Sequence, residues 1–232
     1  MAKRNKKKQQ EEELLIDLAE KQEQAKEYYQ RNQMLILGAM FGFVFLFGGW
    51  YVYKNLIKAP QEKEASAQLY GAENQMLRDS FALALTSPGG EYPGLLDIID
   101  DYGSTSAGNL ANYYAGVCYL NLGQYAKAIE YLEDFSPAGS VTPSTTLGLL
   151  GDAHSELNEM DKALGYYKQA SAKATNEVTT PYYLLKAGML MEKQGNANEA
   201  IAMYEKIKSE YPKSIQGSSI DKYIARINNR PK

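Results

Sequence analysis

The sequence predicts an all-α protein in which an N-terminal transmembrane helix precedes a short α-solenoid of helical hairpins with a C-terminal capping helix. An uncharged apolar segment of twenty residues starts at Met34, apolar residues elsewhere recur with a helical period, and three later segments repeat one pattern. We therefore divide the chain into a basic helical tail that we place in the cytoplasm (1–33), a transmembrane helix (34–53), a linker helix with a degenerate helical hairpin (54–108), three repeats (109–212), and a capping helix with a tail (213–232).

The membrane segment contains no charged residue from Asn32 to Tyr53. Twenty helical residues rise about 30 Å, which matches the hydrocarbon core of a bilayer. A cleaved signal peptide is the alternative, because Ala65-Ser66-Ala67 resembles a peptidase site. However, 33 residues precede the apolar segment, and a signal peptide has only a short basic region there. The pattern therefore favours a retained anchor.

The orientation follows from the Lys and Arg residues on the two sides of this segment. Their excess on the N-terminal side predicts a cytoplasmic N-terminus and a periplasmic C-terminal domain in a bacterial inner membrane. Residues Lys3, Arg4, Lys6, Lys7, Lys8, Lys21, Lys26 and Arg31 precede the segment, and Lys54, Lys58 and Lys63 follow it closely.

Two features of the N-terminal part allow alternative interpretations. The basic run from Lys3 to Lys8 could contact anionic lipid or the ribosome, although a flexible tail that only fixes topology is the favoured interpretation. Gly38, Gly42 and Gly49 share one face of the membrane helix. They form either a packing face for a second transmembrane helix or the ordinary glycine content of such helices.

Three segments after residue 108 repeat one pattern, and two kinds of small residue mark it. Gly116, Gly151 and Gly188 recur at intervals of 35 and 37 residues, as do Ala128, Ala163 and Ala200. We expect these residues where the two helices of a hairpin cross closely. The repeats are Asn109–Phe135, Ser144–Ala170 and Pro181–Pro212, with turns at Leu122-Gly123, Asn158 and Gly195-Asn196.

The pattern resembles the tetratricopeptide repeat. That family has Leu-Gly and then Tyr in its first helix, Ala and an aromatic residue in its second, and a closing proline, which Pro212 matches. Asn112 departs from the pattern, since a large residue is usual there, and the loops 136–143 and 174–180 are longer than usual. The resemblance implies a protein-binding solenoid.

The flanks of the repeats also have helical patterns. Helices are expected over Gln61–Leu85 and Leu95–Tyr102, with a break at Ser87-Pro88-Gly89-Gly90, and together they form a degenerate fourth hairpin. Residues Ser214–Ile227 form an amphipathic pattern that suits the cap a solenoid needs.

Residues that could support catalysis or bind a cofactor are scarce. His154 is the only histidine and stands where the family has Tyr, so we expect it to pack in the hairpin rather than bind a metal. The glycine-rich run Gly89–Gly94 lacks a phosphate-loop pattern, and the Asp97, Asp100 and Asp101 cluster lacks the spacing of a calcium loop. Cys118, the single cysteine, is expected to be buried and inert. We expect no enzyme activity and no cofactor.

Proteins are the expected partners, and the net charge of −3 argues against nucleic acid. In tetratricopeptide proteins the first helices of the hairpins line a concave groove. With Asp152 and Glu156 there, we do not expect the Lys, Arg and Asn clamp that some members use for a peptide carboxylate. The groove is either open to apolar or amphipathic segments or filled by the chain's own hairpin or cap. The candidates are Tyr113, Val117, Leu120, Asn121, Asp152, Glu156, Tyr182, Leu185 and Met189.

The whole architecture is similar to that of YfgM-like ancillary subunits of the bacterial Sec translocon. This resemblance implies a membrane-anchored, adaptor-like or chaperone-like subunit that contacts translocon subunits, exported polypeptides or periplasmic chaperones. A structural scaffold of another cell-envelope assembly or secretion complex is the alternative. A cytoplasmic receptor would follow if the orientation were inverted.

Overall fold

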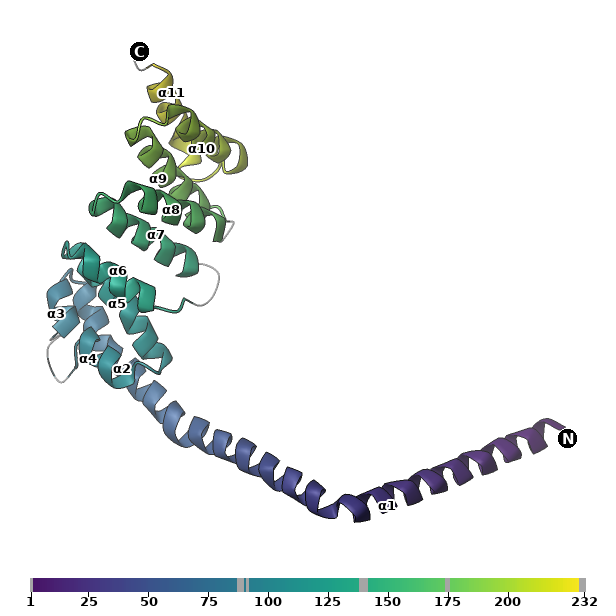
Figure 1. The fold of residues 1–232 in the computed structure, drawn as a ribbon. Coiled ribbons are helices and arrows are strands. Elements are labelled where there is room, and N and C mark those ends of the chain that lie inside the picture. The colour runs from purple at the N-terminus through teal and green to yellow at the C-terminus, as the bar shows by residue number, and fades with distance from the viewer. Residues whose placement is uncertain (1, 87–89, 91, 138–141, 174–175, 230–232) are drawn as a thin grey trace. The chain divides into compact units, whose positions relative to one another are not determined.

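The chain forms two compact units, Met1–Pro60 and Gln61–Lys232, which are described separately. The computed structural model describes residues 2–86, 90, 92–137, 142–173 and 176–229, and for residues 2–20 and 25 it describes the backbone only. All regular secondary structure in these residues is helical (Figure 1). The predicted all-α fold is confirmed.

The first unit is helical from Ala2 onward. Helix α1 (Ala2–Val52) is broken at Asn32, where φ is −115° and ψ is 16°, and the π-helical segment η1 (Tyr53–Lys58) follows it. The described part of the chain contains one helix that is long and apolar enough to cross a membrane, and it includes residues 34–53. Its apolar side chains, such as Phe45 and Leu46, are exposed. This exposure distinguishes the segment from the buried core helix of a soluble domain.

Helix α2 (Ala59–Met76) leads into the second unit, and two short helices, α3 (Phe81–Thr86) and α4 (Leu95–Tyr102), follow it. The single helix expected over Gln61–Leu85 is wrong, because the chain turns between α2 and α3. At Asp79 the φ angle is +55°, a left-handed conformation that no helix continues through. The predicted break at residues 87–90 lies, except for Gly90, outside the described residues.

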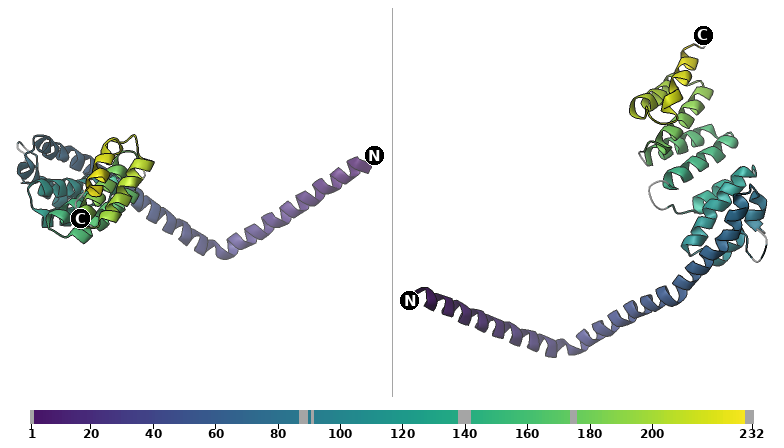
Figure 2. Two further views of the ribbon diagram at one scale, coloured as in Figure 1. Left: turned by 90° about the horizontal axis from the view of Figure 1, so that it is seen from above. Right: turned by 180° about the vertical axis from the view of Figure 1, so that it is seen from behind.

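Three antiparallel hairpins follow and stack on one another (Figures 1 and 2). The first contains α5 (Ser106–Asn121) and α6 (Tyr125–Asp134), the second α7 (Thr142–Glu156) and α8 (Met160–Lys173), and the third α9 (Thr179–Lys193) and α10 (Ala197–Glu210). Both long loops between hairpins include residues outside the described part of the chain.

Each hairpin turns through one residue with a positive φ angle: Gly123 at 71°, Asn158 at 62° and Gly195 at 85°. The next residue donates its N–H to the carbonyl five positions earlier, as Glu159 does to His154 at 2.9 Å. This is the Schellman arrangement, which satisfies the last carbonyl groups of the first helix. The predicted turn positions are therefore confirmed.

The repeated glycines lie where the two helices of a hairpin approach each other. A Cβ atom on Gly116 would lie 2.5 Å from Cγ of Leu132, and one on Gly151 would lie 2.6 Å from Cε1 of Tyr167. At Gly188 it would collide with Tyr204 in the same way. These distances leave no room for any side chain, which explains why the pattern repeats.

The C-terminal cap consists of the 3-10 turn η2 (Gly217–Ser219) and α11 (Ile220–Asn228). Its helix therefore begins six residues later than Ser214, where we expected it. Ser214 instead holds a turn: its Oγ donates to the Tyr211 carbonyl at 2.7 Å and accepts from the Gly217 N–H at 2.9 Å. Ile220 and Ile227 are buried against the third hairpin.

Candidate protein-binding groove

An ion pair joins the second and third hairpins along their first helices. Nζ of Lys186 on α9 lies 2.6 Å from Oδ1 and 2.7 Å from Oδ2 of Asp152 on α7. The hydroxyl of Tyr167 on α8 also donates to Oδ1 of Asp152, at 2.7 Å. We call Asp152, Tyr167 and Lys186, together with Tyr182 on α9, the Asp152–Lys186 cluster.

Aromatic rings surround the cation of this cluster. Nζ of Lys186 lies 5.1 Å from the centroid of the Tyr182 ring and 5.6 Å from that of Tyr167. Burial opposes the charge on Lys186, but the hydrogen bond and charge of Asp152 outweigh it and raise the pKa of Lys186. Burial and the bond to Asp152 raise the pKa of Tyr167. The raised pKa values keep Lys186 protonated and Tyr167 neutral at neutral pH.

Two hollows adjoin the cluster. The larger, about 370 Å³, extends from the first hairpin across α7 to Lys186, and the smaller, about 220 Å³, lies against α9. Leu120, Asn121, Asp152 and Glu156 line the larger hollow, and Met189 lines the smaller. The structure thus brings five of the nine candidate groove residues to one connected surface.

The remaining four candidates line neither of these two hollows. Tyr182 belongs to the cluster through its ring, and it lines a third hollow that is described below. Tyr113 packs on Phe135, with ring centroids 5.2 Å apart. Leu185 packs partly buried against the C-terminal core, and Val117 is half-buried in α5 without lining a described hollow.

The basic side of this surface is not among the residues predicted from the sequence. Lys186 and Lys193 both line the smaller hollow, so the surface contains cations as well as Asp152 and Glu156. Lys186 follows the candidate Leu185 directly in α9. Asp152 lies 34 residues before Lys186 in the sequence. An opposite charge about one repeat away on the same helix of the hairpin is the signal that could have revealed the pair.

Comparisons with known proteins agree with the hairpin pattern. Residues 110–136 and 182–214 match one tetratricopeptide repeat model, and residues 146–179 match a second. The chain carries tetratricopeptide repeats. The crystal structure of MamA resembles this chain with a TM-score of 0.51 and 18% identity, over 68% of this chain and 92% of that one, and this likeness concerns the fold alone. No curated protein matches the sequence.

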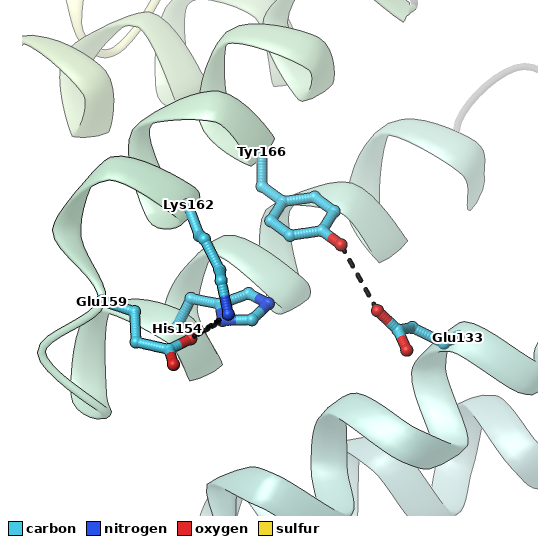
Figure 3. A network of polar contacts seen from close by, with 5 residues as sticks. All are labelled: Glu133, His154, Glu159, Lys162 and Tyr166. Atoms are coloured by element: carbon cyan, nitrogen blue, oxygen red, sulfur yellow. Dashed lines mark hydrogen bonds and ion pairs between the residues drawn. The ribbon is translucent and has the colours of Figure 1, made fainter.

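His154 occupies the tetratricopeptide position that usually holds Tyr, and it is buried in the second repeat (Figure 3). Its Nδ1 lies 2.6 Å from Oε2 of Glu159, which also accepts a 3.0 Å bond from Lys162. Its ring stacks on Tyr166 with centroids 5.1 Å apart. The predicted packing role of His154 is confirmed.

Tyr166 extends this network to the first repeat. Its hydroxyl donates to Oε1 of Glu133 on α6 at 3.4 Å (Figure 3). Among the described residues, no group of three or more His, Cys, Asp or Glu side chains could hold a metal ion. Cys118 is buried as expected, and burial raises its pKa to about 12.

The glycines of the membrane segment are open. Apart from the adjoining residues and nearby backbone of the same helix, no atom lies within 4 Å of a Cβ built on Gly38, Gly42 or Gly49. Packing against another transmembrane helix at this face stays a prediction.

Proposed function

We propose that this chain is a membrane-anchored protein-interaction subunit at the secretion translocon, where its repeats contact exported polypeptides or periplasmic chaperones. Tetratricopeptide repeats support protein binding, and the apolar N-terminal helix supports anchoring. In this proposal the N-terminus is cytoplasmic and the repeats are periplasmic.

The Asp152–Lys186 cluster is the observation that carries the binding proposal. It presents paired charges between tyrosine rings at the edge of two hollows. Aromatic faces and the flexible Met189 suit apolar side chains of varied shape, while Glu156 and Lys193 can bond polar groups beside them. Such a surface suits amphipathic segments rather than one fixed charged terminus.

Anchoring provides the mechanism. A helix held in the membrane keeps the groove at a high effective concentration beside the channel. A low binding affinity of the groove is therefore enough for repeated, brief contacts. No chemical turnover is needed.

Site-specific crosslinking tests this proposal. A photo-reactive residue in place of Met189, which lines the groove, is compared with one in place of Lys206, which is exposed on the second helix of the same hairpin. We expect adducts with translocon subunits and with many exported polypeptides at position 189 but not at 206. Adducts with a single stoichiometric partner would favour the scaffold alternative, and equal adducts at both positions would contradict a role for the groove.

The orientation has its own test. Alkaline phosphatase fused after Lys232 is active only outside the cytoplasm, so we expect activity in intact cells. An inactive fusion that is present at normal levels would overturn the periplasmic placement.

A further inference from the structure

A third hollow lies between the last two hairpins and the cap. Its volume is about 670 Å³, and its lining is mostly apolar. The walls come from the start of α7 at Thr145, the start of α9 around Tyr182 and Tyr183, and the connection between α10 and α11 around Ile215. We call this hollow with its rim the cap patch.

Two aliphatic side chains stand at the rim of the cap patch in contact with water. Ile215 is 86% exposed and Val178 is 74% exposed. Removal of an aliphatic side chain from water lowers the free energy, and an apolar rim beside an apolar hollow is typical of an interaction surface. The patch therefore suits an apolar protein surface.

The connection that carries Ile215 is held in place by its neighbour. Ser214 is buried and bridges the Tyr211 carbonyl and the Gly217 N–H. A fixed connection presents Ile215 without a large ordering cost on binding. Ile215 is thus a preorganised projection next to the hollow.

The charges of the cap patch are complementary to each other. Glu177 and Lys213 both line the hollow, so it carries one anion and one cation. An interface between two copies related by a two-fold axis uses the same patch on each, and it must therefore be complementary to itself. The cap patch meets that condition in charge and, with a projection beside a hollow, in shape.

We propose that the cap patch is the interface between two copies of this chain. Ile215 of one copy enters the hollow of the other, and Glu177 of each pairs with Lys213 of its neighbour. Anchoring in one membrane favours this pairing, since it raises the concentration of copies near each other. This inference goes beyond the proposed function and does not depend on the identity of the groove's partner.

Sedimentation equilibrium of the full chain in density-matched detergent tests this interface. We expect a reversible dimer whose dissociation constant rises at least about tenfold in Ile215→Asp, because a charge replaces a buried aliphatic group. The matched control is Leu77→Asp, since Leu77 is 87% exposed between α2 and α3 and does not line the patch. Circular dichroism of each variant establishes that it is folded.

Three results would overturn the proposal. If the wild-type chain is monomeric, the cap patch binds a different protein. If Ile215→Asp leaves the dimer unaffected, the dimer interface lies elsewhere, for instance at the membrane glycines. Equal weakening by Ile215→Asp and Leu77→Asp would show a general effect of added charge.

A charge exchange provides an independent test of the two-fold arrangement. Glu177→Lys or Lys213→Glu alone places like charges together in both symmetric pairs. Because two exposed pairs are affected, each variant should raise the dissociation constant of the dimer roughly fourfold to twenty-fivefold. The double variant Glu177→Lys with Lys213→Glu should restore wild-type dimerisation. Failure of this restoration while both single variants weaken the dimer would overturn the predicted pairing.

Discussion

Lys186 and Asp152 connect two repeats through a two-pronged contact, with Nζ 2.6 Å and 2.7 Å from the carboxylate oxygens. Only 27% of the Lys186 side chain and 31% of the Asp152 side chain are exposed. The charges are thus largely shielded from water, so loss of one leaves the other poorly compensated.

The first prediction concerns removal of this cation. Lys186→Met keeps a long apolar stem against the tyrosine rings but takes the cation from Asp152. We expect the free energy of unfolding to fall by about 1–2 kcal/mol, since the pair is partly buried. Urea unfolding followed by near-ultraviolet circular dichroism measures this loss. The control Lys168→Met, at an exposed position on α8, should unfold like the wild type.

A second prediction compares two glycines of the second hairpin. Gly151→Ala places a Cβ 2.6 Å from Cε1 of Tyr167, so the ring must move and its bond to Asp152 is disturbed. We expect a loss of about 1–3 kcal/mol, as for other overpacked sites. Gly165→Ala meets no atom within 4 Å in α8 and should stabilise the protein by up to about 1 kcal/mol. Equal effects of the two variants in thermal unfolding would contradict the close crossing.

The third prediction concerns acid stability. Hydrogen bonds from Lys162 and His154 hold the pKa of Glu159 below its usual value of 4.5. Such a carboxylate contributes stability that is fully present above its unfolded pKa and is lost as pH falls through the folded pKa. Between about pH 5 and about pH 3, Glu159→Gln should therefore lose less stability than the wild type. Parallel loss in both proteins would show that the contacts of Glu159 contribute nothing.

The repeated glycines show why the hairpins could be predicted from the sequence. Gly116 and Gly151 lie where backbones approach within one hairpin, and that constraint is local, so it recurs at a visible interval. The break at Asp79 was not predicted, because this residue takes a left-handed conformation where the sequence lacks the Gly that usually marks one.

The groove was predicted less completely for a different reason. Lys186 reaches Asp152 across neighbouring hairpins, and the pattern inside one repeat does not specify how successive repeats are staggered. The cap patch likewise depends on three segments far apart in the chain, from Thr145 to Ile215. The repeat interval brings such residues near each other, but the packing of the repeats decides whether they touch.

The last prediction concerns the cap. Glu192 on α9 is only 5% exposed to solvent. It accepts hydrogen bonds from Nη2 and Nε of Arg226 on α11, at 2.6 Å and 3.0 Å. The hydroxyl of Tyr204 also donates to Oε2 of Glu192, at 3.2 Å. Arg226→Met leaves a buried carboxylate without this cation, and since Arg226 itself is half exposed we expect a loss of about 1–3 kcal/mol.

Limited proteolysis can locate this loss, because α11 should open before the hairpins do and be cleaved first. The control Lys208→Met breaks a pair with Asp221 whose side chains are both exposed, so cleavage of α11 should stay at the wild-type rate. Glu192→Gln in the Arg226→Met background should cost less than in the wild type, because the carboxylate has already lost its cation. Additive effects of the two substitutions would contradict a direct coupling between α9 and the cap.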